Sequence, residues 1–458
     1  MSKNHLYVNL YETLKQQIIE GQYKSEDKFP SKRALGQHLS VSNTTIEHAY
    51  QLLLDEGYIY SKPRSGYFVS DIETLPIIPT NINHAHQIFS SNENFHNPKP
   101  DYDLAFNMSE IDTEYFPMKQ FRKYAKDAFE DDELDLLLHA SFKGEISLRQ
   151  EIAHYLFNSR GVTCHPEQII IGSSTEQLIN LLTDILSNGK FLIENPSYPP
   201  IKQVLDKKQI TYLQVPVSHT GIEIDYFQKS NNNIAYVTPS HQFPTGYVMS
   251  LKKRTQLINW AQQSEGRYII EDDYDSEFRY FGKPIPALQS LDTKDKVIYI
   301  STFSKSLFPS CRIAYLVLPN KLLSTYNQLN NKEGNTVPAH TQKIVANFMK
   351  SGSFERHLNK MRNVYRHKLT TILNALMPYQ SQLKIDGALA GMHFTLTVKN
   401  SLTMKQCLEN AKKNKLKIIP FSQYDNNQNS AKFILGFGGI PISQLKEHTD
   451  ALIKSLIV

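Results

Sequence analysis

The sequence predicts an α/β protein in which a small helical module with a β-hairpin precedes a much larger domain. In residues 1–70, three segments with apolar residues at helical spacing are followed by two short runs rich in aromatic and β-branched residues. From residue 103 onward, short apolar runs typical of buried strands alternate with helical segments, as in α/β folds. Residues 71–102 contain prolines among Asn, His and Ser, which is typical of an extended linker. We therefore expect two domains, 1–70 and 103–458, joined by a linker over 71–102.

The composition argues against several classes of protein. With 458 residues, 40% of them hydrophobic, the chain can form more than one core. Its net charge of +5 permits nucleic-acid binding without arguing for it. The three cysteines are widely spaced and the linker histidines form no compact ligand set, so we predict neither a disulfide scaffold nor a metal site. No leader segment and no run of about 18 apolar residues occurs, so we expect a cytoplasmic protein that is not in a membrane.

The N-terminal module is predicted to contain a helix-turn-helix. Apolar spacing indicates a first helix from about Tyr7 to Ile18. Ser31 and Ser42 are N-cap candidates that open a second and a third helix, and two short helices joined by a tight turn form this motif. Residues 57–69 then predict a β-hairpin with a basic tip.

The predicted DNA contacts follow from the way such a motif docks. The second helix of the pair enters the major groove with its N-terminal residues nearest the bases, here Ser42, Asn43, Thr44 and Thr45. Contacts to phosphates or the minor groove are expected from Ser31, Lys32, Arg33, Lys62 and Arg64. A small protein-interaction domain is the alternative, and charge does not distinguish the two, because residues 1–69 hold eight Lys/Arg and seven Asp/Glu.

Four motifs give this module a specific resemblance. Phe-Pro-Ser-Lys-Arg-Ala-Leu (29–35), Val-Ser-Asn-Thr-Thr (41–45), Leu-Leu-Asp-Glu-Gly-Tyr (53–58) and Ser-Gly-Tyr-Phe-Val (65–69) resemble the GntR-type winged helix-turn-helix. The resemblance implies DNA binding. That family commonly has Arg where this chain has Asn43, and since Asn can read adenine bidentately, the preferred operator is expected to differ.

In the large domain, several apolar strands end in polar or aromatic residues. Residues 169–171 lead to a small-residue turn, Gly172–Thr175, whose backbone N–H groups could bind an anion. Three further strands lead to Tyr198, to the stretch 238–246 and to Glu271-Asp-Asp-Tyr274. In open α/β sheets, ligands bind beyond the carboxyl ends of the strands, so these ends are expected to converge on one site.

A further strand, 297–300, leads to a polar turn with a single lysine, Lys305. A lysine behind an apolar strand can be desolvated and lowered in pKa, which an amine needs if it is to condense with an aldehyde. The nearby hydroxyls of Thr302 and Ser304, together with Arg312, could hold a phosphate dianion. Asp272 or Asp273 could keep a pyridine nitrogen protonated.

Together these features resemble the fold-type I pyridoxal-phosphate enzymes of the aspartate aminotransferase superfamily. The resemblance implies a mostly parallel central sheet, a smaller C-terminal lobe and pyridoxal 5'-phosphate as cofactor. It makes Lys305 the Schiff-base lysine, Asp272 the partner of the pyridinium, Tyr198 the ring-stacking aromatic and Tyr274 the group near the ring hydroxyl. It also implies that the phosphate is held by Ser173, Ser174, Thr175, Ser304 and Arg312.

Two departures from that pattern stand out. Phe243 occupies the position of the usual asparagine, so that His241 or Gln242 would have to serve the cofactor ring. The C-terminal lobe has no arginine within residues 416–439 that could bind a substrate carboxylate.

The order of the two domains resembles the MocR family of bacterial transcription regulators, which bind promoter DNA and a small-molecule effector. Several motifs are close to its member that responds to γ-aminobutyrate. That member's carboxylate-binding arginines fall at Pro200 and Gln423 here, so we expect pyridoxal phosphate, alone or with an amine or amino acid, to be sensed, as in the vitamin B6-responsive members. The resemblance also implies a head-to-tail homodimer. The alternatives are an active aminotransferase with an appended DNA-binding domain, and a cofactor-free domain used only for dimerisation.

Overall fold

A computed structural model describes residues 6–71, 102–130, 136, 138, 141–281, 285–329, 334–425 and 430–457. The chain divides into two compact units, Met1–Lys99 and Pro100–Val458. Almost all of the predicted linker lies outside the described residues, so the predicted boundaries at 70 and 103 stay a prediction. The described part contains no helix that is long and apolar enough to cross a membrane.

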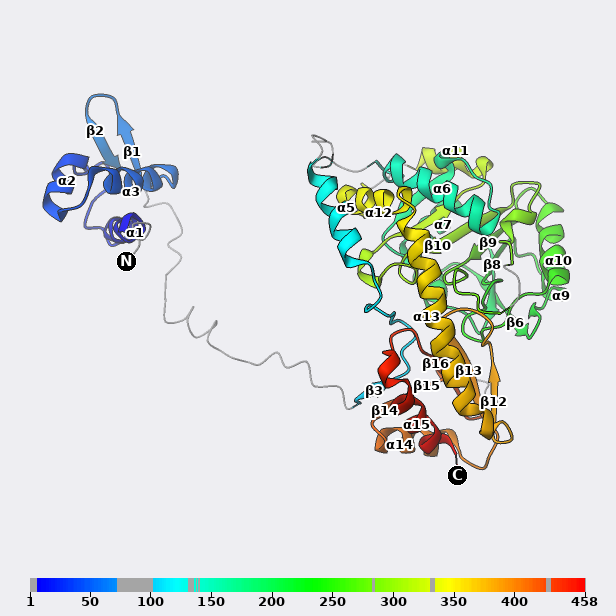
Figure 1. The fold of residues 1–458 in the computed structure, drawn as a ribbon. Helices are drawn as coiled ribbons and strands as arrows, with labels where there is room; N and C mark the ends of the chain where they lie inside the picture. Colours follow the sequence, from blue (N-terminus) through cyan, green and yellow to red (C-terminus); the bar gives the residue numbers. More distant parts are fainter. Residues whose placement is uncertain are drawn as a thin grey trace. The chain divides into compact units, whose positions relative to one another are not determined.

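Within its described residues 6–71, the N-terminal unit contains three helices and a hairpin (Figure 1). Their bounds are α1 (Leu6–Ile19), α2 (Lys32–Leu39), α3 (Asn43–Asp55), β1 (Ile59–Lys62) and β2 (Gly66–Val69), the two strands being antiparallel. Both predicted N-caps are confirmed: the Ser31 hydroxyl accepts a hydrogen bond from the Ala34 N–H and the Ser42 hydroxyl one from the Thr45 N–H, each 3.2 Å long. Tyr50 lies fully buried at the centre of this unit's core.

An eight-stranded sheet forms the centre of the second unit. Its order is β4-β11-β10-β9-β8-β5-β6-β7. The strands β10, β9, β8, β5 and β6 pair in parallel, whereas β11 is antiparallel to both β10 and β4, so the expected mostly parallel sheet is confirmed. The bounds are β4 (Ile169–Gly172), β5 (Phe191–Asn195), β6 (Tyr212–Ser218), β7 (Gly221–Ile222), β8 (Ile234–Val237), β9 (Tyr268–Asp272), β10 (Val297–Thr302) and β11 (Ala314–Val317).

Helices cover both faces of this sheet (Figure 1). The central strands are therefore buried along their whole length, which explains their continuous apolar runs. Alternate residues face opposite layers: Ile169 and Ile171 belong to one core cluster, and Ile170 to another. The helices are α5 (Met118–Glu130), α6 (Ile146–Arg160), α7 (Thr175–Ile185), α8 (Pro199–Lys207), α9 (Asp225–Gln228), α10 (Leu251–Gln262), α11 (Asn320–Gln328), α12 (Ala339–Lys350) and α13 (Ser353–Leu376).

A smaller C-terminal lobe follows α13, as expected. Its antiparallel sheet has the order β12-β13-β16-β15, and a two-stranded parallel sheet pairs β14 with β3 from the start of the unit. The bounds are β3 (Leu104–Ala105), β12 (Leu383–Asp386), β13 (His393–Val398), α14 (Met404–Lys413), β14 (Leu416–Lys417), β15 (Ile419–Pro420), β16 (Lys432–Gly436) and α15 (Leu445–Leu456).

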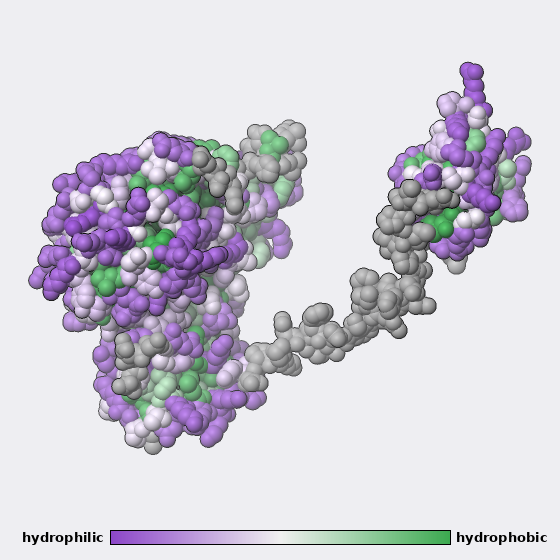
Figure 2. All heavy atoms as spheres, turned by 180° about the vertical axis from the view of Figure 1, so that it is seen from behind, coloured by the Kyte–Doolittle hydropathy of each residue, from purple (hydrophilic) through white to green (hydrophobic). Residues whose placement is uncertain are grey.

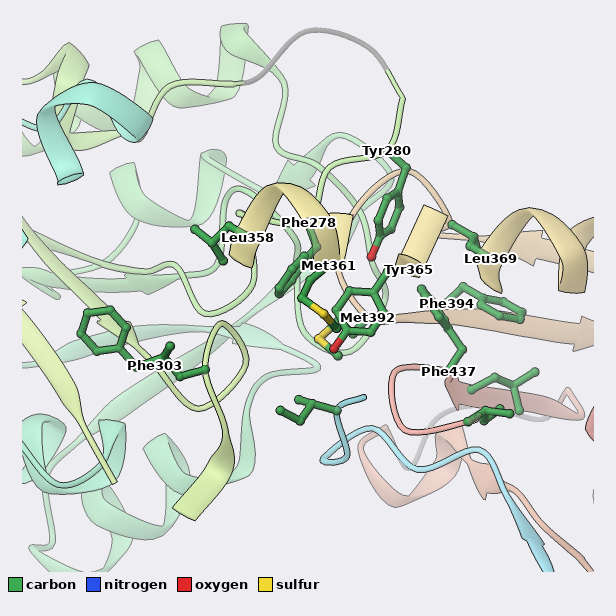
Figure 3. Packing of buried hydrophobic residues seen from close by; sticks show 14 of the residues in the cluster. Phe278, Tyr280, Phe303, Leu358, Met361, Tyr365, Leu369, Met392, Phe394 and Phe437 are labelled. Carbon is green, nitrogen blue, oxygen red and sulfur yellow. The ribbon is translucent and has the colours of Figure 1, made fainter. Parts of the chain in front are cut away.

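One continuous core connects the lobe to the rest of the second unit. Figure 3 shows Tyr365 of α13 among Phe278, Met361 and Met392, and the rings of Tyr365 and Phe278 lie 5.0 Å apart. A buried ion pair, Lys368–Asp112 at 2.6 Å, joins α13 to the segment before α5. On the face seen in Figure 2, the surface of this unit is mainly hydrophilic, with separate hydrophobic areas.

Candidate functional site

A cavity of about 450 Å³ lies at the carboxyl ends of the central strands. Since β4 and β10 are both antiparallel to β11, the end of β4 opens on the same edge as the ends of the parallel strands. The predicted convergence of strand ends is therefore confirmed. Nine residues that the sequence assigned to the cofactor line the cavity: Ser174, Thr175, Tyr198, Asp272, Tyr274, Thr302, Ser304, Lys305 and Arg312.

Asp272, the last residue of β9, presents an unused acceptor in this cavity. Its Oδ2 accepts a short hydrogen bond from the Tyr236 hydroxyl, which fixes the orientation of the carboxylate. Its Oδ1 is buried and has no hydrogen-bond partner. Burial, together with the negative charges of Asp273 and Asp275, raises the pKa of Asp272 to about 7, although the Tyr236 hydrogen bond lowers it. A cationic N–H placed at Oδ1 would satisfy this group.

Lys305 lies in the turn after β10. Its ammonium donates a short hydrogen bond to the Met108 carbonyl, from the segment that precedes α5. Burial lowers the pKa of Lys305, while the nearby Asp275 carboxylate opposes that shift. A larger fraction of this amine is therefore neutral at pH 7 than for a solvated lysine, and the neutral form is the nucleophile.

Hydroxyls and a guanidinium also line the cavity. Helix α7 begins at Thr175, and the free backbone N–H groups of a first helical turn favour an anion. Thr302 shapes the turn before Lys305, since its Oγ1 accepts a hydrogen bond from the Ser304 N–H at 3.2 Å. Arg312 has a φ of +48°, which residues other than glycine seldom adopt, and its side chain is exposed.

Two of the predicted cofactor residues do not line the cavity. The Ser173 N–H and hydroxyl both donate to the Gln177 side chain, at 2.7 and 3.3 Å. His241 is buried, with its Nδ1 2.9 Å from an Asp275 oxygen and 3.2 Å from the Tyr274 hydroxyl. Gln242, the other candidate for the ring, donates to the carbonyl of Pro196 at 2.8 Å and so holds its own loop.

Several cavity residues were not predicted. Asp275 follows the Asp-Asp-Tyr motif directly and could have been found there, whereas His393 and Tyr424 come from the C-terminal lobe, where no motif indicated them. The ligand atoms of His241, Asp275 and His393 lie within 4.8 Å of one another. Burial, together with the nearby His241 and Lys305, lowers the pKa of His393 well below its usual value, so its imidazole is neutral at pH 7.

The cavity has few cationic groups that could bind a ligand carboxylate in addition to a phosphate. Pro200 lines it, and Phe243 stands there in place of the usual asparagine. Among the cavity-lining residues within the described ranges, Arg312 is the only arginine. Gln423 lies in the short 3-10 turn Phe421–Gln423, next to the lining residue Tyr424.

The donor set fits pyridoxal 5'-phosphate. The unpartnered Asp272 Oδ1 matches the protonated ring nitrogen, and the Lys305 amine matches the aldehyde. Ser174, Ser304 and Arg312 supply hydroxyls and a cation for the phosphate. The Tyr198 ring, packed edge-on against Phe243 at 5.6 Å, offers a face for stacking.

The predicted DNA contacts lie on one module, and most of them are exposed. Asn43 and Thr44 are exposed at the start of α3, as are Arg33 on α2 and Arg64 at the hairpin tip. Lys32 pairs with Glu47 at 2.7 Å, and Lys62 with Glu26 at 3.1 Å. Because surface pairs are worth about 0–1 kcal/mol, either lysine can be released to a phosphate at little cost. Ser31 and Ser42 use their hydroxyls as helix caps, as described above.

Comparisons with known proteins agree with this geometry. Residues 102–422 match the family model "Aminotransferase class I and II", and residues 6–69 match "Bacterial regulatory proteins, gntR family". The chain is similar to the solved structure of a multiple substrate aminotransferase from Thermococcus profundus, with a TM-score of 0.69, 20% identity and coverage of 82% of this chain and 94% of that one. That likeness concerns the fold.

Three bacterial relatives are similar to this chain over most of their length. The uncharacterized HTH-type transcriptional regulator YdeL of Bacillus subtilis is 37% identical, over 96% of this chain and 95% of its own. The probable rhizopine catabolism regulatory protein MocR of Rhizobium meliloti is 28% identical, over 98% and 93%. The HTH-type pyridoxine biosynthesis transcriptional regulator PdxR of Corynebacterium glutamicum is 28% identical, over 84% and 82%. The chain belongs to the MocR family of transcription regulators, and its aminotransferase-type domain implies pyridoxal 5'-phosphate as cofactor.

Proposed function

We propose that this protein regulates transcription by sensing pyridoxal phosphate, alone or together with an amine or amino acid, with little or no turnover. One observation carries the proposal: the cavity combines Lys305 and Asp272 with a single arginine, Arg312, among its described lining residues. That arginine is needed for the phosphate, so no second guanidinium is left for the carboxylate of an amino-acid substrate.

Different residues of the cavity would hold different parts of the cofactor. When bound, pyridoxal phosphate supplies an electrophilic carbonyl and an electron-withdrawing ring. Asp272, oriented by Tyr236, would accept a hydrogen bond from the ring N–H and so keep the ring nitrogen protonated. Lys305 supplies the amine, which burial holds partly neutral, and the Met108 carbonyl accepts its hydrogen bond in the free protein. Ser174, Ser304 and Arg312 bind the phosphate.

The effector is inferred from the same cavity. Pro200 and Gln423 stand where the γ-aminobutyrate-responsive member has its arginines, which argues against an effector held by its carboxylate at those positions. A relative named as a pyridoxine biosynthesis regulator supports pyridoxal phosphate itself as the signal. The protein would exist in two conformational states, of which one binds the promoter more tightly. The effector would shift the population toward the state that it binds better, by no more than the difference between its affinities for the two states.

A homodimer in the cytoplasm completes the proposal. Large apolar side chains are exposed on α5, in the segment before α6 and at the start of α6: Met118 is 56% exposed, Phe129 62%, Phe142 53% and Ile146 46%. Exposed apolar side chains grouped in this way indicate a protein interface. Two DNA-binding modules in one dimer would then engage paired or repeated half-sites. The cytoplasm is the compartment in which a bacterial regulator meets its promoters.

Absorption spectroscopy and DNA binding together test this function. Wild-type protein should take up pyridoxal phosphate with a visible absorption band that Lys305→Ala lacks, and the cofactor should change the affinity for promoter DNA only in wild-type protein. Single-turnover mixing with a panel of amino acids should give no rapid conversion to the pyridoxamine form. Steady keto-acid production would establish the aminotransferase alternative instead, and a protein that takes up no cofactor would refute both.

A further inference from the structure

A second cavity of about 550 Å³ lies apart from the cofactor cavity and shares no lining residue with it. Its wall is built by the C-terminal half of α6, the segment that follows β9 and the first half of α13. Four arginines line it, Arg160, Arg279, Arg362 and Arg366, against two carboxylates, Glu277 and Glu355. Nothing in the proposed function uses this cavity.

Three polar atoms in this wall are buried without a hydrogen-bond partner: Ser276 Oγ, Glu277 Oε2 and Arg279 Nε. Each such atom costs about 1–3 kcal/mol if it stays unsatisfied, so three of them within the short stretch 276–279 call for a partner. Among the described residues, the guanidinium groups of Arg279 and Arg366 have no carboxylate within ion-pair distance.

The charge in this cavity that is not paired within the protein is mainly positive. Arg160 is already engaged, with its Nε 2.8 Å from an Asp273 oxygen and one Nη 2.8 Å from Ser240. Arg362 uses its Nε and one Nη on the Glu277 carbonyl and the Asn359 side chain, which leaves its second Nη. Burial raises the pKa of Glu277 to about 7, so that this carboxyl offsets only part of the remaining positive charge at neutral pH.

The wall is held rigidly by the core behind it. Phe278 and Tyr280 anchor the segment among the core residues shown in Figure 3. The Tyr280 hydroxyl donates to the Gly391 carbonyl at 2.8 Å, and the Gly391 N–H donates to the Phe278 carbonyl at 2.7 Å. Arg279 therefore has a fixed backbone before any ligand arrives, which lowers the entropic cost of binding.

We propose that this cavity binds a small anion that carries a carboxylate or phosphate group, recognised by Arg279, Arg362 and Arg366. The planar guanidinium presents paired N–H donors that match two oxygens of such a group. Ser276 and Glu277 at the same wall hydrogen-bond to the polar remainder of the ligand, and the volume suits a small metabolite. Since Asp275 lines the cofactor cavity and Ser276 lines this one, a single segment connects the two sites.

Titration calorimetry on full-length protein saturated with pyridoxal phosphate tests this site, with inorganic phosphate and succinate as separate probes. Saturable binding is expected for at least one probe: phosphate alone indicates a phosphorylated metabolite, succinate alone a carboxylate, and both a shared anion site. Arg279→Gln and Arg366→Gln should each weaken binding about tenfold or more, since each removes charge-assisted hydrogen bonds.

Matched variants make the result decisive. Arg356 lies on the same helix α13, is exposed and does not line the cavity, so Arg356→Gln should bind like wild-type protein. Arg366 is also exposed, so its substitution should leave the fold intact, and Arg366→Lys should still bind more weakly because lysine lacks the paired donors. Absence of saturable binding, unchanged affinity in both glutamine variants, or binding that disappears once pyridoxal phosphate is saturating would overturn the proposal.

Discussion

Replacing Asp272 with asparagine should stabilise the cofactor-free protein and weaken its hold on the cofactor. Asp272 is buried next to Asp273 and Asp275, and its Oδ1 has no partner until a cation arrives. The asparagine side chain has a similar shape, and its oxygen can still accept the Tyr236 hydrogen bond. The substitution therefore removes the buried charge, keeps the Tyr236 hydrogen bond and puts an N–H₂ group in place of the unpartnered oxygen.

The size and sign of the effect follow from the pKa of Asp272, which rises from 3.8 to about 7 on folding. At pH values below 3.8, the pKa in the unfolded chain, Asp272 is protonated in both the folded and the unfolded state, so it does not change the free energy of unfolding. As the pH rises the unfolded chain ionises first, so the group destabilises the fold by about 4 kcal/mol near pH 8 but by less than about 2 kcal/mol near pH 5. The asparagine N–H₂ group, left without an acceptor, costs about 1–3 kcal/mol at every pH.

Thermal melting of cofactor-free wild type and Asp272→Asn at several pH values measures this difference. The melting temperature of the variant minus that of wild type should be about 5 °C smaller at pH 5 than at pH 8. This figure takes about 2 °C for each kcal/mol of stability in a domain of this size. In parallel, the variant should bind pyridoxal phosphate more weakly. A stability difference that does not change with pH would refute the assignment of Asp272 as a buried carboxyl whose pKa is raised by folding.

Four further substitutions test other parts of the molecule. Arg33→Ala and Arg64→Ala should each weaken promoter binding and lower the slope of log affinity against log salt by about one, as fluorescence anisotropy can measure; an unchanged slope contradicts these phosphate contacts. Asp112→Ala leaves the buried Lys368 ammonium without its carboxylate and should cost about 3–5 kcal/mol in urea unfolding, whereas a loss below 1 kcal/mol would argue against an ion pair. In Gly436→Ala, the new Cβ would come within 2.4 Å of the Met108 backbone that accepts the Lys305 hydrogen bond, so stability and cofactor affinity should fall together; wild-type affinity would contradict that coupling.

Local sequence patterns were sufficient to predict features that depend only on residues close together along the chain. Ser31 and Ser42 were identified as helix caps because a cap is defined by its own side chain and the next three residues. The ends of the strands could be placed from apolar runs followed by polar residues, and their convergence follows from the parallel sheet that such alternation favours. Lys305 and the pair Asp272 and Asp273 were found in this way, and the family resemblance selected Asp272 from the pair.

Side-chain direction could not be read from the same patterns. Ser173 belongs to the correct turn, but its hydroxyl and N–H are taken by Gln177 one helical turn away. His241 lies in the correct loop, yet it packs against Asp275 and Tyr274 and does not line the cavity. Which face a loop residue presents depends on competing hydrogen bonds, and those partners are known only after packing.

The sequence by itself determined the two-part architecture, the helices and hairpin of the N-terminal module, and Lys305 with the Asp272/Asp273 pair as residues at the strand ends; the family resemblance selected Asp272. Only the tertiary structure decided that Asp272 keeps an unpartnered oxygen, that the Met108 carbonyl meets Lys305 from 197 residues away, and that four arginines from three segments line a second cavity. The reason is that helices and strands are specified by neighbours along the chain. Burial, and therefore the pKa and hydrogen bonding of each charged group, depends on residues that only the fold brings together.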